Sequence, residues 1–297
     1  MIELTTPPQH DSEPIHKPSP RPSHPAIAPF QPHIYIPSPS SSPSSNLLII
    51  LPGLGDHPQS YSSLASSLQN TLPQTAILIL RPPTPIPLLA DPDQHPSQAP
   101  HAWWDAFDLL TGDTLPPQAQ NPRSCLDQLS KLLDYLTAPL SSNGCAWPSH
   151  TLHLFGYGQG GTAALESAIA WTRSQRISSS PARDTHELGS VVSVCGPMLS
   201  QPGSLSTPRR PASIPILSFL RHPSADNSAP QAITERNKLK TAFQPSPQVV
   251  VLPGNEDTML RGKSEFDILI KFWSEQAKWR NRSQWELGQQ EGVYRVA

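Results

Sequence analysis

The chain has 297 residues, enough for one large α/β domain or two small ones, and 36% hydrophobic residues allow a sizeable core. The formal net charge is -2 and no dense lysine or arginine run is present, which argues against nucleic-acid or anionic-membrane binding. Three cysteines lack the paired spacing of a zinc or redox site, so we expect free thiols and no metal or cofactor.

Proline is the composition's unusual feature, with 38 residues, and it is dense at the start of the chain. Residues 1–32 show no helical or strand period, which predicts a disordered or extended segment that could dock a protein partner. The α/β domain is expected over residues 33–280 and a tail over residues 281–297. No apolar run is long enough to span a bilayer and no secretory signal is visible, so we expect a cytoplasmic protein.

Short apolar runs along the chain predict strands, and they alternate with longer amphipathic stretches that predict helices. The expected strands are residues 33–36, 47–51, 76–80, 152–155, 190–194, 214–220 and 248–252. The expected helices are residues 61–68, 125–136, 162–171 and 232–240, followed by a last helix with Phe266, Leu269, Ile270, Trp273 and Ala277 on one face. This alternation predicts a mostly parallel sheet with helices on both faces and a ligand site at the carboxyl ends of its strands.

One turn between an expected strand and an expected helix carries the sequence Gly156-Tyr157-Gly158-Gln159-Gly160. A hydrolase nucleophile elbow has the pattern G-x-S-x-G in this context, so glycine stands where the attacking serine belongs. A glycine-rich phosphate-binding turn is the alternative. The segment lacks the lysine of a P-loop and the spacing of a dinucleotide-binding motif.

Two further segments carry the same resemblance. Residues 51–56, Leu-Pro-Gly-Leu-Gly-Asp, resemble the H-G-L-G-D loop of the acyl-protein thioesterases and related phospholipase/carboxylesterase proteins, with Pro52 in place of histidine. Residues 189–196 resemble the strand that follows the elbow helix, and Trp103-Trp104-Asp105 resembles that family's tryptophan-containing loop. Over residues 46–275 the resemblance implies an α/β-hydrolase fold and, for active relatives, hydrolysis of acyl esters or thioesters.

The resemblance also implies where a substrate carbonyl would be held. In active relatives two main-chain N–H groups form the oxyanion hole, and the corresponding residues here are Leu54 and Gln159. Backbone donors survive side-chain replacement, so this chain could still hold a carbonyl oxygen. The alternative is that Leu54 and Gln159 only shape a turn.

The catalytic triad of this fold runs serine, aspartate, histidine, with histidine after the last strand. All eleven histidines of this chain lie at or before His222, and the family pattern places Asp257 at the histidine position. Asp226 matches the aspartate loosely, and an ordinary solvated loop aspartate is the alternative. Loss of serine or histidine alone costs about a million-fold in kcat in such a triad, so hydrolysis by the family mechanism is not expected.

Other groups of the chain could replace the missing serine and histidine. Cys195 and His222 could form a nucleophile–base pair if both face the mouth, although free cysteines are usually buried apolar residues. Water could attack directly, with Asp257 as base beside Asp226, although an acidic turn in a loop is the simpler interpretation. His150 and His153 diverge if the strand alternates faces, so no metal set is expected.

Three hypotheses result from the sequence. The first is an α/β-hydrolase-fold protein without nucleophile and base, which binds an acyl ester or acyl-thioester ligand without cleaving it. The second is an active ester or thioester hydrolase with a non-standard nucleophile. The third is an interaction module that uses the proline-rich N-terminus.

Overall fold

A seven-stranded sheet in the order β1-β3-β2-β6-β7-β8-β9 forms the centre of the molecule. The computed structural model describes residues 17–39, 44–86, 99–108, 111–116, 119–178, 187–199, 210–226, 228–277 and 279. β1 pairs with β3 in antiparallel orientation, and the other neighbouring strands pair in parallel. The strands are β1 Ile34–Ile36, β2 Asn46–Leu51, β3 Thr75–Ile79, β6 Leu152–Tyr157, β7 Ser190–Val194, β8 Ile216–His222 and β9 Gln248–Pro253. Every strand predicted from the sequence is confirmed to within two residues.

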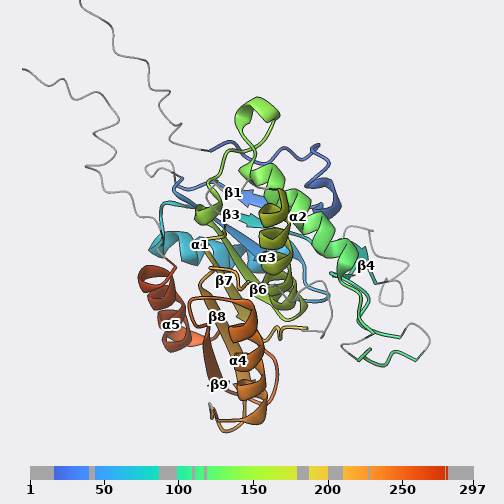
Figure 1. Ribbon diagram of the computed structural model, residues 1–297, viewed down its shortest axis with the longest axis vertical. Coiled ribbons are helices and arrows are strands. Elements are labelled where there is room, and N and C mark those ends of the chain that lie inside the picture. Colours follow the sequence, from blue (N-terminus) through green and yellow to red (C-terminus); the bar gives the residue numbers. More distant parts are fainter. Residues whose placement is uncertain are drawn as a thin grey trace, which may run out of the picture.

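Helices cover both faces of the sheet, as expected for an α/β-hydrolase fold. The helices are α1 Ser62–Thr71, α2 Arg123–Thr137, α3 Gln159–Ser178, α4 Pro230–Ala242 and α5 Gly262–Glu275. Figure 1 shows α2, α3 and α4 in front of the strands, while residues of α1 and α5 pack in the core layer on the opposite face. A two-residue ribbon, β4 Thr84–Pro85 with β5 His101–Ala102, lies in the long proline-rich connection and was not predicted.

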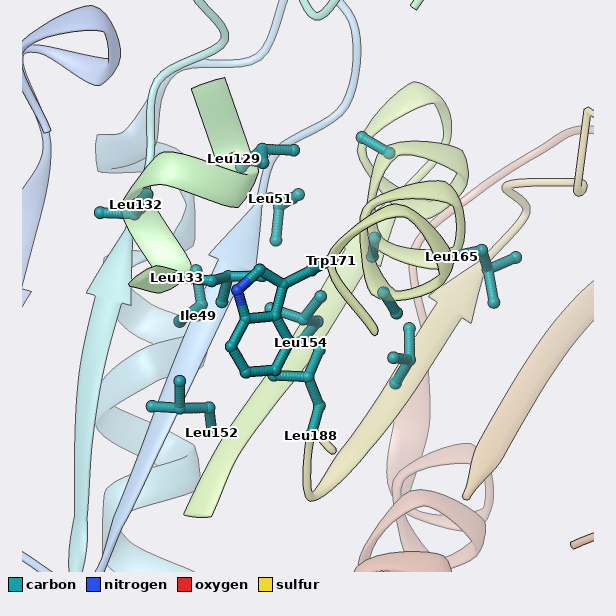
Figure 2. Close-up of a cluster of buried hydrophobic side chains, with 14 of the residues drawn as sticks. Ile49, Leu51, Leu129, Leu132, Leu133, Leu152, Leu154, Leu165, Trp171 and Leu188 are labelled. Atoms are coloured by element: carbon teal, nitrogen blue, oxygen red, sulfur yellow. The ribbon is translucent and has the colours of Figure 1, made fainter. Parts of the chain in front are cut away.

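The continuous apolarity of β2 reflects burial on both faces. Leu47 and Ile49 join the core layer under α2 and α3, whereas Leu48 and Ile50 join the layer under α1 and α5. In the first layer the Trp171 indole points from α3 into a set of leucines from α2 and the strands (Figure 2). Its Nε1 donates a 2.8 Å hydrogen bond to Asp134, so the buried indole keeps a polar partner.

The N-terminal segment corrects an expectation. Residues 17–32 are not disordered, because Ile27 and Phe30 are fully buried in the core layer that contains α2. The Arg81 amide donates to the Phe30 carbonyl at 3.2 Å, and the His24 ring stacks on Tyr135 with centroids 3.7 Å apart. A few apolar anchors therefore suffice to dock a proline-rich stretch. Residues 1–16 and the expected tail 281–297 lie outside the described residues.

The amino-terminal edge of the sheet holds a buried histidine. His153 in β6 lies with its Nδ1 2.9 Å from the Ser190 hydroxyl, and its ring stacks on Trp279 with centroids 4.0 Å apart. Burial lowers the pKa of His153 from 6.5 to about 3. The folded protein therefore holds this imidazole neutral at pH values where an unfolded chain protonates it.

We predict that Phe30→Ala lowers the free energy of unfolding by about 3 to 5 kcal/mol, because it removes a fully buried aromatic ring. Urea titration followed by circular dichroism measures the change. The matched control is Leu140→Ala, at a side chain that is 51% exposed, and its effect should stay within about 0.5 kcal/mol. Equal effects of the two variants would contradict the docking of the N-terminal segment.

His153 predicts a specific loss of stability in acid. Its folded-state pKa is depressed, so its contribution to stability is full above pH 6.5 and falls as the pH drops towards 3. Within that window the free energy of unfolding should fall by about 1.4 kcal/mol per pH unit through this group alone. His153→Asn, which keeps a polar group near Ser190, should lack this component in urea titrations between pH 4 and 7. Parallel pH profiles of the two proteins would refute the assignment.

Candidate active site

A single residue, Gly158, connects β6 to α3. Its φ is +52°, in the left-handed region that favours glycine. Its amide donates to the Val194 carbonyl at 2.8 Å, and its carbonyl accepts from the Gly161 and Thr162 amides at 2.9 and 3.1 Å. A Cβ placed on Gly158 would meet no heavy atom within 4 Å. The turn has the shape of a nucleophile elbow, with open space where the nucleophile's side chain would stand.

The glycines on either side of this turn are required for close packing. A Cβ on Gly156 would collide with the Gly160 carbonyl, and a Cβ on Gly160 would collide with the carbonyl oxygens of Leu51 and Pro52. The start of α3 thus lies directly against the end of β2. This contact brings the elbow beside the loop that contains Leu54.

The loop after β2 is tied down at both ends. The indole Nε1 of Trp103 donates to the Pro52 carbonyl at 2.8 Å, and the Gly55 amide donates to the His101 carbonyl at 2.8 Å. Within the loop, the Asp56 carboxylate accepts from the Tyr61 hydroxyl at 2.7 Å and from the Gly53 amide at 3.1 Å. The residues that flank Leu54 are therefore fixed before any ligand arrives.

Gln159 contributes more than the sequence indicated. Its side-chain Oε1 accepts from the Trp103 amide at 2.8 Å, and its Nε2 donates to the Trp104 carbonyl at 2.9 Å. It is also the first residue of α3, where amides have no partner within the helix and the helix dipole favours negative charge. The main-chain amide of Gln159 is thus one of the two donors predicted for the oxyanion hole. Its side chain holds the Trp103-Trp104 segment, which in turn fixes Pro52. No sequence pattern indicates this contact, because Trp103 and Gln159 lie 56 positions apart.

Asp257 lies in the loop after β9 and is exposed to solvent. The carbonyl of Asp257 accepts from the Tyr157 hydroxyl at 2.9 Å, and the carbonyl of Thr258 accepts from the Nε of Arg221 at 3.0 Å. Tyr157 is the residue before Gly158. Asp257, which stands where the family has its catalytic histidine, therefore lies at the same end of the sheet as the elbow.

Cys195 does not form the nucleophile–base pair considered from the sequence. Its thiol is 3.7 Å from the Thr258 carbonyl, while the Nδ1 of His222 lies 2.8 Å from the Ser224 hydroxyl. Burial, followed by the charge of Asp257, raises the pKa of Cys195 to about 11, so the thiol stays protonated at neutral pH. The simpler interpretation of Cys195 as a buried thiol holds instead, because neighbouring strand ends do not fix where their side chains point.

Asp226 is turned towards the start of α4. Its two carboxylate oxygens accept from the Ser228 amide at 2.8 Å and from the Ser228 hydroxyl at 2.5 Å. These hydrogen bonds to Ser228 lower the pKa of the exposed Asp226 carboxyl. Its carbonyl accepts from the Ala229 amide at 3.1 Å. The contacts are those of a turn before a helix, and they do not place Asp226 beside Asp257.

The described part of the chain holds no group of three or more His, Cys, Asp or Glu side chains placed to bind a metal ion. None of its helices is long and apolar enough to cross a bilayer.

Comparison with known proteins gives a consistent result. Residues 33–238 match the phospholipase/carboxylesterase family. An uncharacterized hydrolase, UM10204, of Mycosarcoma maydis is 35% identical over 267 residues, which cover 88% of this chain and 87% of that protein.

Solved structures resemble the fold. Esterase PE8 superimposes with a TM-score of 0.56 at 15% identity, over 82% of this chain and 97% of that one. Acyl-protein thioesterase 2 of Zea mays gives a TM-score of 0.53 at 18% identity, over 82% and 98% of the respective chains. With the sheet topology and the family match, these likenesses lead to one conclusion. The chain belongs to the phospholipase/carboxylesterase family and has the α/β-hydrolase fold.

Proposed function

We propose that this protein binds an acyl ester or acyl thioester and does not hydrolyse it. The observation that carries the proposal is Gly158, a left-handed elbow residue with open space in place of a nucleophilic side chain. The elbow of this family positions a serine hydroxyl, and glycine offers no atom that could attack a carbonyl carbon. The turn is kept and its reactive group is absent.

The other two triad positions also support the proposal. The chain has no histidine after His222, and Asp257 stands at the family's histidine position. The Asp226 carboxylate already accepts two hydrogen bonds from Ser228. An enzyme without nucleophile and base retains only about 10³ to 10⁴ of rate enhancement over water, from carbonyl binding and positioning.

The ligand class follows from the parts that are retained. Hydrogen bonds with Trp103 and His101 hold the loop that contains Leu54, and Gln159 begins α3 beside it. Two fixed main-chain amides in this arrangement suit the oxygen of an ester or thioester carbonyl. The cysteine alternative for an active enzyme loses its support, because the Cys195 thiol is buried and has a raised pKa.

The decisive experiment restores the missing groups. The unmodified protein should not react with a fluorophosphonate probe and should not turn over p-nitrophenyl butyrate. The double variant Gly158→Ser/Asp257→His should be labelled by the probe, because the open space at the elbow admits a hydroxyl.

Two outcomes would contradict the proposal. A kcat of about 1 per second or more for the unmodified protein, within the ordinary range of enzymes, would show that it is a working hydrolase. A folded double variant that resists the probe would show that the carbonyl-binding amides are not in place.

The elbow also makes a prediction about stability. Gly158→Ser should lower the free energy of unfolding by about 1 to 2 kcal/mol, the cost of a side chain in the left-handed conformation. The matched control, Gly160→Ser, should be far more damaging, because its Cβ would collide with the main-chain carbonyls of Leu51, at the end of β2, and Pro52. Urea titration compares the two. Equal losses would mean that the space at 158 is not open.

A further inference from the structure

The loop between β9 and α5 is held through its main chain. The carbonyl of Asp257 accepts from the Tyr157 hydroxyl at 2.9 Å. The next two carbonyls, of Thr258 and Met259, accept from Arg221 Nε and Nη2 at 3.0 and 2.9 Å. Three successive peptide groups are thus fixed by side chains from β6 and β8, and none of these bonds involves a side chain of the loop itself.

Arg221 is the centre of this arrangement. Its side chain is 4% exposed, and all five of its N–H groups have acceptors. Besides the carbonyls of Thr258 and Met259, the guanidinium donates to the Pro253 carbonyl at 3.1 Å and to the two carboxylate oxygens of Glu265 at 3.1 and 2.8 Å. The planar group therefore joins the end of β9, the loop and the first turn of α5. The compact ammonium group of a lysine could not donate to all of these acceptors.

Glu265 completes the arrangement from α5. Its carboxylate compensates the buried charge of Arg221, and it also accepts from the Arg261 amide at 2.6 Å. An uncompensated guanidinium at this depth would be strongly destabilising. The ion pair with Glu265 thus allows the Arg221 guanidinium to be buried where it donates hydrogen bonds to three main-chain carbonyls.

We propose that Arg221 is a positioning residue that fixes position 257 at the elbow end of the sheet, through the main chain and independently of the side chain at 257. The loop therefore keeps its place although aspartate stands where the family has histidine. The inference rests on the proposed function only in counting position 257 as part of the acyl site.

A nitroxide at position 257 tests the proposal without ligand or turnover. Cys125 and Cys145 are buried, and Cys195, which contacts the Asp257 side chain, is replaced by alanine in every variant, so a thiol-specific label on Asp257→Cys should attach at the exposed site alone. Adding Arg221→Met together with Glu265→Leu removes all five bonds and leaves no unpaired charge. The rotational correlation time of the label, from its electron paramagnetic resonance spectrum, should then shorten roughly threefold or more, as in free loops.

Two controls separate positioning from simple stabilisation. Glu265→Gln removes the ion pair but leaves the three carbonyl bonds of Arg221, so it should lower the urea midpoint without loosening the label at 257. A second label on Asp267→Cys, at a site on α5 that is 58% exposed, reports whether the helix itself has moved. It should be unchanged in every variant.

The outcomes are separable. An immobile label in the Arg221→Met/Glu265→Leu background would overturn the proposal, and so would equal loosening by Glu265→Gln or simultaneous loosening at 257 and 267. If the double replacement does not fold, Arg221→Lys takes its place, with loosening at 257 expected and the same results counting against it. These results are independent of the probe-labelling test of function, so each proposal can fail alone.

Discussion

The close approach of α3 to the end of β2 is the constraint on which the mouth of the site depends. It requires glycine at 156 and 160, because main-chain carbonyls occupy the space that a Cβ would need. Because of this proximity, the side-chain amide of Gln159 hydrogen-bonds to the main chain of Trp103 and Trp104. The Trp103 indole in turn donates to the Pro52 carbonyl. None of these contacts uses the side chain at 158. The arrangement of these loops therefore does not depend on the residue at position 158.

Much of the fold could be predicted from the sequence, because buried parallel strands are short apolar runs with few alternatives. The sequence pattern starts α3 too late, at residue 162, since Gly160 and Gly161 have low helix propensity and only tertiary packing makes them helical. The error at residues 17–32 has the opposite origin. Proline-rich composition suggested disorder, whereas burial of Ile27 and Phe30 decides the outcome.

The site was predictable to the level of its loops and no further. Carboxyl ends of parallel strands meet at one edge, so the loops of Leu54, Gly158 and Asp257 had to converge there. Their side-chain bonds depend on partners distant in the sequence, such as Arg221 with Glu265, and on rotamers that no periodicity encodes. The hydrogen bonds from Ser228 to Asp226 join residues only two positions apart. The sequence alone could not tell this local contact from a triad role for Asp226.

The left-handed backbone at Gly158 has a consequence for how such a protein changes over generations. A serine there carries conformational strain, and glycine relieves it, so loss of the nucleophile is favoured by folding. Selection for a stable fold then opposes the return of the serine, and only selection for turnover could retain it. In the non-catalytic binder proposed above, no selection for turnover remains, so fold stability alone maintains glycine at this position.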